Sequence, residues 1–309
     1  MLTLPTYVLI TPAHNEAAFI ELTLRSVTAQ TVLPLKWVIV SDGSTDGTDD
    51  IVSNYLASYP WVELIRLPER HERHFAGKVN AFNAGWAAVR TLPYDIIGNL
   101  DADVSFDADY FEFLLRKFAE NPGLGVGGTP FREGSFQYDY RFTSIEHVSG
   151  QCQLFRRECF DEIGGYIPRK IGGVDLVAVI TARMKGWQTR TFLDKPYVHQ
   201  RQMGTATANV LIAPFKVGRS DRILGSHPMW ECARCVYQTT RPPIVLGGAL
   251  RLAGYLWEVV RCSKIQVSAE FVRFRRREQM QRLYRFVTRR RAGNGSEHGE
   301  ITLHAGRRY

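Results

Sequence analysis

Short apolar runs alternate with stretches of helical periodicity over the first hundred residues of the chain. Apolar positions in unbroken or nearly unbroken runs predict buried strands at Tyr7–Ile10, Trp37–Val40, Val62–Leu67 and Tyr94–Leu100. Between them, apolar residues at helical spacing predict helices that start near Asn15, Thr48 and Lys78. Strands that alternate with helices indicate βαβ units, so we expect an α/β fold with a Rossmann-like, mostly parallel central sheet flanked by helices.

The pattern becomes less regular beyond residue 125. It still predicts a strand and turn at Gly125–Pro130, a helix over Asp175–Gly186 and a strand at Tyr197–Val198. The α/β body is expected to end near residue 205. This gives a domain at 1–205, a mostly helical region at 206–291 and a tail at 292–309 whose composition favours disorder.

One segment of the helical region suggests a surface partner. Residues 244–260 are apolar except for Arg251 and Glu258, which share a helix face, and 17 residues fall short of a comfortable membrane span of about 20 residues. We therefore expect an amphipathic helix that lies on a membrane or packs on the body.

Charge is concentrated at the end of the chain. From Arg261 onward there are 13 Lys/Arg against four Asp/Glu, and the remainder is nearly balanced at 26 against 27. Residues 273–291 add an apolar stripe to this basic segment. An anionic membrane surface is the expected partner, and the alternative is a solvated helix with a frayed end. Nucleic acid is not expected, because the basic run lies outside the α/β body and carries no recognisable nucleic-acid motif.

Two carboxylates, in Asp101-Ala-Asp103, directly follow the fourth predicted strand, and Asp42 follows the second. Ligands of open α/β sheets bind beyond the carboxyl ends of the strands, so these side chains are expected to share one site. Mg²⁺ and Mn²⁺ typically take one or two carboxylates together with phosphate oxygens. Acidic pairs are common on surfaces, but this position predicts a site for a divalent metal and a diphosphate.

Five motifs occur in an order that resembles glycosyltransferase family 2, whose members adopt the GT-A fold. They are Thr11–Glu16, Val38–Thr48, Gly77–Gly85, Asn99–Asp103 and an aspartate, Asp175, placed eleven residues before Gly186-Trp187. The resemblance covers roughly residues 6–200. It implies a nucleotide-sugar-dependent transferase that uses Mn²⁺ or Mg²⁺.

The resemblance also assigns residues to the donor site. It implies nucleotide contacts at Pro12, Ala13, Asn15, Glu16, Asp42, Lys78, Asp101 and Ala102. Within that set Asp42 would contact the base, and Asp101 would touch the ribose or the water shell of the metal. Asp103 would be the direct metal ligand.

Asp175 is the candidate general base that removes the proton of the acceptor hydroxyl. The family usually has a Glu-Asp pair here, whereas this chain has Val174-Asp175, so the supporting glutamate is missing. A second interpretation is that Asp175 caps the following helix, and the two roles are compatible.

The remaining candidates are a late histidine and a set of sugar or acceptor residues. His199 is a possible extra metal ligand, with a structural role as the alternative. Sugar or acceptor contacts are expected from Gln151, Gln153, Tyr166, Trp187 and Arg201, and the alternative is ordinary core packing.

Together these features predict an inverting, metal-dependent glycosyltransferase. It would move a sugar, expected to be UDP-linked, to a hydroxyl of a lipid-linked or polysaccharide acceptor during envelope or exopolysaccharide synthesis. Scattered cysteines and the absence of a visible signal peptide favour the cytoplasm, at the inner face of the membrane. A nucleotidyltransferase-type enzyme of nucleotide-sugar metabolism and a non-catalytic binding protein with a basic tail are the alternatives.

Overall fold

The computed structural model describes residues 3–69, 75–133, 136–137, 144–169, 172–201, 212–240 and 244–292. The chain separates into two units, Met1–Val210 and Leu211–Tyr309. This division falls five residues beyond the predicted end of the α/β body at 205. The tail predicted to be disordered, 292–309, lies outside the described residues except for Ala292.

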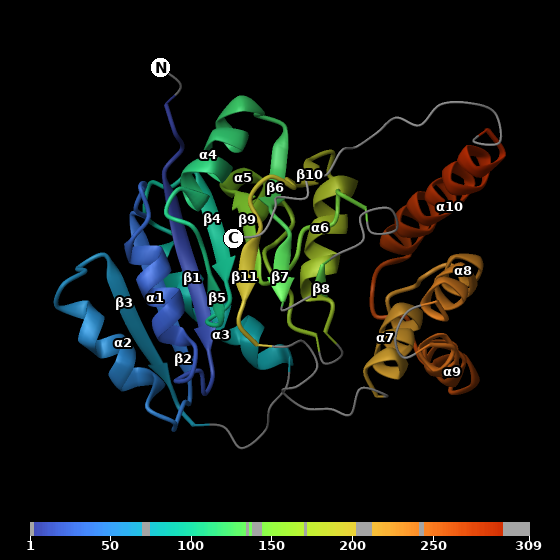
Figure 1. Cartoon of the computed structure of the whole chain (residues 1–309), viewed down its shortest axis with the longest axis horizontal. Helices are drawn as coiled ribbons and strands as arrows, with labels where there is room; N and C mark the ends of the chain where they lie inside the picture. Colours follow the sequence, from blue (N-terminus) through green and yellow to red (C-terminus); the bar gives the residue numbers. More distant parts are fainter. Residues whose placement is uncertain are drawn as a thin grey trace, which may run out of the picture. The chain divides into compact units, whose positions relative to one another are not determined.

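A seven-stranded sheet forms the centre of the first unit, in the order β10-β6-β9-β4-β1-β2-β3 (Figure 1). All strands run parallel except β9, which is antiparallel to both neighbours. The predicted mostly parallel sheet is therefore confirmed. Its strands are β1 (Tyr7–Ala13), β2 (Lys36–Asp42), β3 (Val62–Leu67), β4 (Ile96–Leu100), β6 (Leu124–Gly128), β9 (Cys152–Arg156) and β10 (Gln188–Thr191).

Helices cover both faces of this sheet, as Figure 1 shows. One apolar core joins the sheet to α1, α2 and α4, and a second core joins the other face to α3, α5 and α6. Two cores on opposite faces explain why the central strands are apolar throughout rather than alternating. The helices are α1 (Ile20–Thr28), α2 (Thr48–Leu56), α3 (Phe75–Val89), α4 (Tyr110–Glu120), α5 (Arg157–Glu162) and α6 (Val174–Met184).

A small second sheet, in the order β5-β11-β7-β8, lies in the same unit. Its strands are β5 (Val104–Ser105), β7 (Phe131–Glu133), β8 (Phe136–Gln137) and β11 (Tyr197–His199). The register places His199 opposite Val104, the residue after Asp103. This pairing brings a late part of the unit to the end of β4.

The second unit is helical, as predicted. Among its described residues it contains α7 (Ile212–Ile223), α8 (Pro228–Gln238), α9 (Leu246–Val260) and α10 (Ala269–Ala292). In α9, Arg251 and Glu258 share one face, and that face is buried. Within the described part of the chain, no helix combines the length and the apolar character needed to cross a membrane.

Candidate active site

The carboxyl ends of β1, β2 and β4 lie at one edge of the sheet. These strands are adjacent and parallel, with Ala13 opposite Ser41 and Ile10 opposite Asn99. The loops that follow them therefore meet at this edge. Asp42 is the last residue of β2, and Asp101 directly follows β4. The structure thus places at the same end of the sheet the two acidic positions that the sequence predicted would share a site.

The loop after β1 is held by polar side chains of the loop after β2. Asn15 adopts the left-handed conformation, with φ of 56°. Its side-chain oxygen accepts the N–H of Thr45 at 2.9 Å, and its own N–H donates to the Ser44 hydroxyl at 3.1 Å. The N–H of Glu16 donates to the Thr48 hydroxyl at 2.8 Å. Pro12 and Ala13 end β1 at the base of this loop, so this predicted nucleotide segment has a fixed shape.

Lys78 on α3 forms an ion pair with Asp101. Burial and the nearby charge of Asp103 raise the pKa of Asp101, and Lys78 opposes them. Burial lowers the pKa of Lys78, but the carboxylates of Asp101, Asp175 and Asp103 outweigh it, so that pKa is raised and the ammonium stays charged. The backbone N–H of Asp101 donates to the carbonyl of Gln151 at 2.8 Å. A cation and two acidic side chains therefore converge where β4 ends.

Asp103 and His199 are buried side by side. The Asp103 Oδ2 to His199 Nε2 distance is 3.4 Å, and the other ring nitrogen, Nδ1, lies 3.0 Å from Glu133 Oε2. Burial lowers the pKa of His199, but the hydrogen bonds to the two carboxylates raise it more. Burial raises the pKa of Asp103, but its bond to His199 and the charge of Arg201 lower it below the ordinary value.

The residues around Asp103 fit a divalent ion with few protein ligands. Ligand atoms about 2.1 Å from one ion lie about 3 Å apart, close to the Asp103–His199 separation. A metal-binding histidine usually gives its other N–H to a carboxylate, as the geometry at Glu133 allows. Among the described residues, no three His, Cys, Asp or Glu side chains form a metal-binding group, so phosphate and water would complete the shell.

Arg201 joins the first and last parts of the site. Its guanidinium forms an ion pair with Glu16, and its Nε lies 3.5 Å from Asp103 Oδ2. The guanidinium also lies over the ring of Phe19, 5.2 Å from the centroid. The structure thus places Arg201 against the nucleotide segment and the candidate metal ligand.

Asp175 lies in the first turn of α6 and faces the same cluster. The helix is capped by Gly173 in the left-handed conformation, so the interpretation of Asp175 as the N-cap residue is wrong. Its side chain packs on the backbone of Gly150, where an added Cβ would lie 2.7–2.9 Å from three Asp175 atoms. The Gly150 carbonyl accepts the Asn99 amide at 2.6 Å. The sheet therefore fixes the loop against which Asp175 rests.

Several predicted sugar or acceptor residues have internal partners. The carbonyl of the Gln151 side chain accepts the Tyr197 hydroxyl at 2.9 Å, next to the Asp101 backbone contact. Gln153 is fully buried, donates to the Val148 carbonyl at 2.7 Å and accepts the Tyr166 hydroxyl at 2.6 Å. Because Gln153 and Tyr166 satisfy each other in the core, their placement favours the alternative of core packing over a sugar contact.

Trp187 and Ala102 also depart from the expected placement. Trp187 precedes β10, whose first residue pairs with Leu124 at the start of β6. Trp187 therefore lies at the amino-terminal end of the parallel strands, opposite the end that carries the aspartates. Its indole donates to Glu162 at 3.0 Å, away from the aspartate cluster. Ala102 is buried, and its carbonyl accepts the Thr23 hydroxyl at 2.8 Å. It separates the two aspartates, and its side chain faces the core.

Two positions in the site were missed by the sequence reasoning. Glu133 ends β7 in an irregular stretch, and only the pairing of β7 with β11 brings it to His199. Gly150 directly precedes Gln151, a predicted sugar or acceptor residue, but the sequence does not show what it packs against. Its function as the surface behind Asp175 is visible only in three dimensions.

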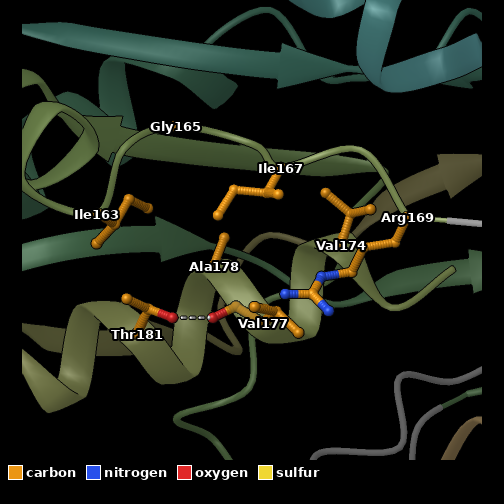
Figure 2. Close-up of a pocket in the computed structure, with 8 residues that line it drawn as sticks. All are labelled: Ile163, Gly165, Ile167, Arg169, Val174, Val177, Ala178 and Thr181. Carbon is orange, nitrogen blue, oxygen red and sulfur yellow. Dashed lines mark hydrogen bonds between the residues drawn. The ribbon is translucent and has the colours of Figure 1, made fainter. Parts of the chain in front are cut away.

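A small pocket lined mainly by apolar residues lies on another face of α6. Figure 2 shows Val174, Val177, Ala178 and Thr181 of the helix facing Ile163 and Ile167, with Arg169 at one end. Burial lowers the pKa of Arg169. Asp175 does not line this pocket, which is therefore distinct from the carboxylate cluster.

Comparison with known proteins identifies the family of the chain. The family model described as glycosyl transferase family 2 matches residues 8–168, more than half of the chain. The chain therefore belongs to glycosyltransferase family 2 and is a glycosyltransferase enzyme.

Curated relatives include the poly-beta-1,6-N-acetyl-D-glucosamine synthase of Staphylococcus aureus, 29% identical over 137 residues. The synthase of Staphylococcus epidermidis is 28% identical over the same length. These matches cover 44% of this chain and 31% of each relative, so the chain spans about a third of the relatives' length.

Solved structures show the same fold. The mannosyltransferase PcManGT from Pyrobaculum calidifontis, in complex with GDP-Man and Mn²⁺, has a TM-score of 0.54 at 19% identity and covers 95% of this chain and 82% of its own. Staphylococcus aureus TarS 1–349 with UDP-GlcNAc has a TM-score of 0.54 at 15% identity, covering 92% and 81%. The predicted GT-A fold is confirmed.

Proposed function

We propose that this enzyme is an inverting, metal-dependent glycosyltransferase that moves a sugar from a nucleotide sugar to an acceptor hydroxyl. The observation that carries the proposal is the convergence of Lys78, Asp101, Asp103 and Asp175 around the end of β4. Each would have a different task in sugar transfer. A purely structural role for these four residues does not account for three carboxylates lying close together.

The donor nucleotide would lie across the loops after β1 and β2. Asp42 offers hydrogen-bond acceptors to a base or ribose at the end of β2, and the rigid loop at Asn15 offers backbone groups. We propose UDP as the nucleotide, in keeping with the TarS complex, although the PcManGT complex holds GDP-Man. The donor sugar would then project toward Asp101 and Asp175.

Asp103 and His199 would hold the divalent ion, with Glu133 orienting the imidazole ring. When bound, the ion supplies Lewis-acid stabilisation of the negative charge that builds on the diphosphate. Lys78 adds a fixed positive charge beside Asp101. Arg201 adds a second, next to Asp103, so the leaving group would depart into a positively charged environment.

Asp175 would accept the proton of the acceptor hydroxyl. The acceptor oxygen then bonds to the anomeric carbon while the bond from that carbon to the diphosphate oxygen breaks. The electron pair of that bond leaves with the diphosphate, and the configuration inverts. A carboxylate held against Gly150 is positioned before the acceptor arrives, which lowers the entropic part of the barrier.

The acceptor would be a lipid-linked or polysaccharide hydroxyl, and the polymer in the names of the synthase relatives favours the polysaccharide. We further propose that the enzyme works at the inner face of the cell membrane. Residues 211–309 carry 19 Lys/Arg against seven Asp/Glu, a balance that attracts an anionic surface.

Thermal-shift measurements with a panel of nucleotide sugars, with and without Mn²⁺, test the donor site. We expect one nucleotide to stabilise the protein only when Mn²⁺ is present, and Asp103→Ala to lose this response. Asp175→Ala should keep the response and lose transfer. Asp107→Ala, which changes an exposed aspartate outside the cluster, is the control.

Product analysis separates this reaction from nucleotidyl transfer. Release of nucleoside diphosphate supports sugar transfer, and release of pyrophosphate contradicts it. Full turnover in both Asp103→Ala and Asp175→Ala would refute the site assignment.

A further inference from the structure

Helix α9 buries its charges. Arg251 is 5% exposed and Glu258 is 2% exposed. Arg251 forms ion pairs with Asp221 of α7 and Glu231 of α8, and Glu258 pairs with Arg219 of α7. The polar face of this amphipathic helix therefore points into the second unit.

The outward face of α9 is apolar. Exposed fractions are 45% for Leu246, 49% for Leu256, 50% for Trp257 and 81% for Val260. Ala249 and Ala253, between them in sequence, are also exposed. Intervals of three and four residues place these side chains on one side of the helix. No charged residue of α9 is on this side.

Close backbone packing explains how the second unit can bury the charged face of α9 and leave the apolar face exposed. A Cβ added at Gly254 would lie 2.1 Å from the Phe215 carbonyl oxygen, and one at Gly218 would lie 1.9 Å from the Arg251 carbonyl oxygen. Glycines thus let α7 and α9 approach until ion pairs and main chain fill the interface. The bulky apolar side chains of α9 are left outside, where exposure to water is unfavourable.

The charge of the unit indicates what covers this face. Residues 211–309 carry 19 Lys/Arg against seven Asp/Glu, and three of the acids, Asp221, Glu231 and Glu258, are buried in ion pairs with arginines, so an excess of basic residues is left. Arg261, just after α9, lies 5.8 Å over the Trp257 ring. Positive charge opposes contact with a second copy and favours an anionic partner. An apolar face with Trp and Arg at its end is typical of a helix in a lipid interface.

We propose that the outward face of α9 inserts into the boundary between headgroups and acyl chains of an anionic bilayer. This rests on the membrane location proposed above and identifies the inserting element as α9 rather than the basic segment alone. With 15 residues, α9 is about 22 Å long, shorter than the hydrocarbon core of about 30 Å, so it lies along the surface.

Cosedimentation of the full chain with vesicles of phosphatidylglycerol and phosphatidylcholine tests the proposal. The variant is Leu256→Gln with Trp257→Gln, and the matched control is Leu22→Gln in the first unit, where leucine is 45% exposed. The double variant should lower the partition coefficient by about tenfold or more, because the lost apolar contact exceeds the 1.4 kcal/mol that a tenfold change represents. The control should bind like the wild type.

A second measurement locates α9 directly. Lipids brominated along the acyl chain should quench the wild-type tryptophan emission more than that of Trp257→Phe. Equal quenching would overturn the proposal. So would vesicle binding that vanishes in high salt and is unchanged in the double variant, since arginines alone would then explain it.

Controls for folding and self-association complete the test. The double variant should keep the wild-type melting temperature and the Mn²⁺-dependent donor response, which separates failure of this inference from failure of the proposed reaction. Sedimentation velocity should show the same oligomeric state for both proteins. If the variant instead dissociates an oligomer and binds vesicles normally, a second copy covers α9 and the lipid proposal fails.

Discussion

Replacement of Gly150 by alanine adds one methyl group next to Asp175 and so tests whether Asp175 is the catalytic base. The new Cβ would lie 2.7 Å from Asp175 Cβ, 2.8 Å from Oδ2 and 2.9 Å from Cγ, whereas ordinary contacts begin at 3.4 Å. Asp175 or the loop must therefore move by about 0.5–0.7 Å in a packed site. The hydrogen bond from Asn99 to the Gly150 carbonyl restrains the loop, so most of the movement falls on Asp175.

The expected loss of rate follows from this shift. A misplacement of 1 Å can lower a rate by about 100-fold, so the shift should lower kcat by about 10- to 25-fold. Donor binding should change little, because Asp175 is expected to act on the acceptor. The loss should therefore appear in kcat, with the KM for the donor nearly constant.

Release of nucleoside diphosphate from the donor identified by thermal shift is a suitable assay, with water or sugar alcohols as acceptors. Gly123→Ala is the control, because its Cβ would meet neighbours at an ordinary 3.4 Å near Gln188, at the opposite edge of the sheet. Wild-type kcat in Gly150→Ala would refute the assignment of Asp175 as base. An equal loss of donor affinity would show that the change acts on the nucleotide site instead.

Three further predictions concern the metal site and the second unit. Glu133→Gln should weaken Mn²⁺ binding, measured by titration calorimetry with the donor nucleotide, by about 10- to 100-fold, because Glu133 orients His199; unchanged affinity would argue against His199 as a ligand. In the metal-free protein, the raised pKa of His199 means that its protonated form stabilises the fold. This stabilisation is fully present below the ordinary pKa of 6.5 and is lost as the pH rises through the raised pKa. Urea titrations at several pH values should show this loss in the wild type and not in His199→Gln. Arg251→Met should lower the unfolding free energy of the second unit by about 3–5 kcal/mol, because Asp221 and Glu231 lose a buried partner; a change below about 1 kcal/mol, as for a surface ion pair, would contradict this.

The sequence predicted most of the sheet and the end of the sheet at which its acidic candidate residues lie. Strands buried on both faces have apolar runs that local pattern reveals, and β3 has the predicted bounds Val62–Leu67. Parallel topology then places the ends of β2 and β4 on the same side of the sheet, as expected for Asp42 and Asp101. These inferences needed only periodicity and chain direction.

Contacts between distant segments could not be predicted in the same way. Gln153 and Tyr166 are polar residues that satisfy each other in the core, and pattern alone cannot distinguish this from a sugar contact. Trp187 follows the helix of the candidate base in sequence, yet β10 begins at the far edge of the sheet. In α9 the shared face of Arg251 and Glu258 was predictable, but their burial depends on partners in other helices.

The ion pair between Glu16 and Arg201 joins residues 185 positions apart. One partner lies in the first loop of the α/β unit and the other near its end, so the site closes only when almost the whole unit is present. A growing chain on the ribosome would have the β1 and β2 loops long before it has Arg201 or His199. Closure over so long a loop is also an intrinsically slow folding step. Competence to bind donor should therefore arise late in synthesis, after residue 201 has emerged, and truncated nascent chains should lack it.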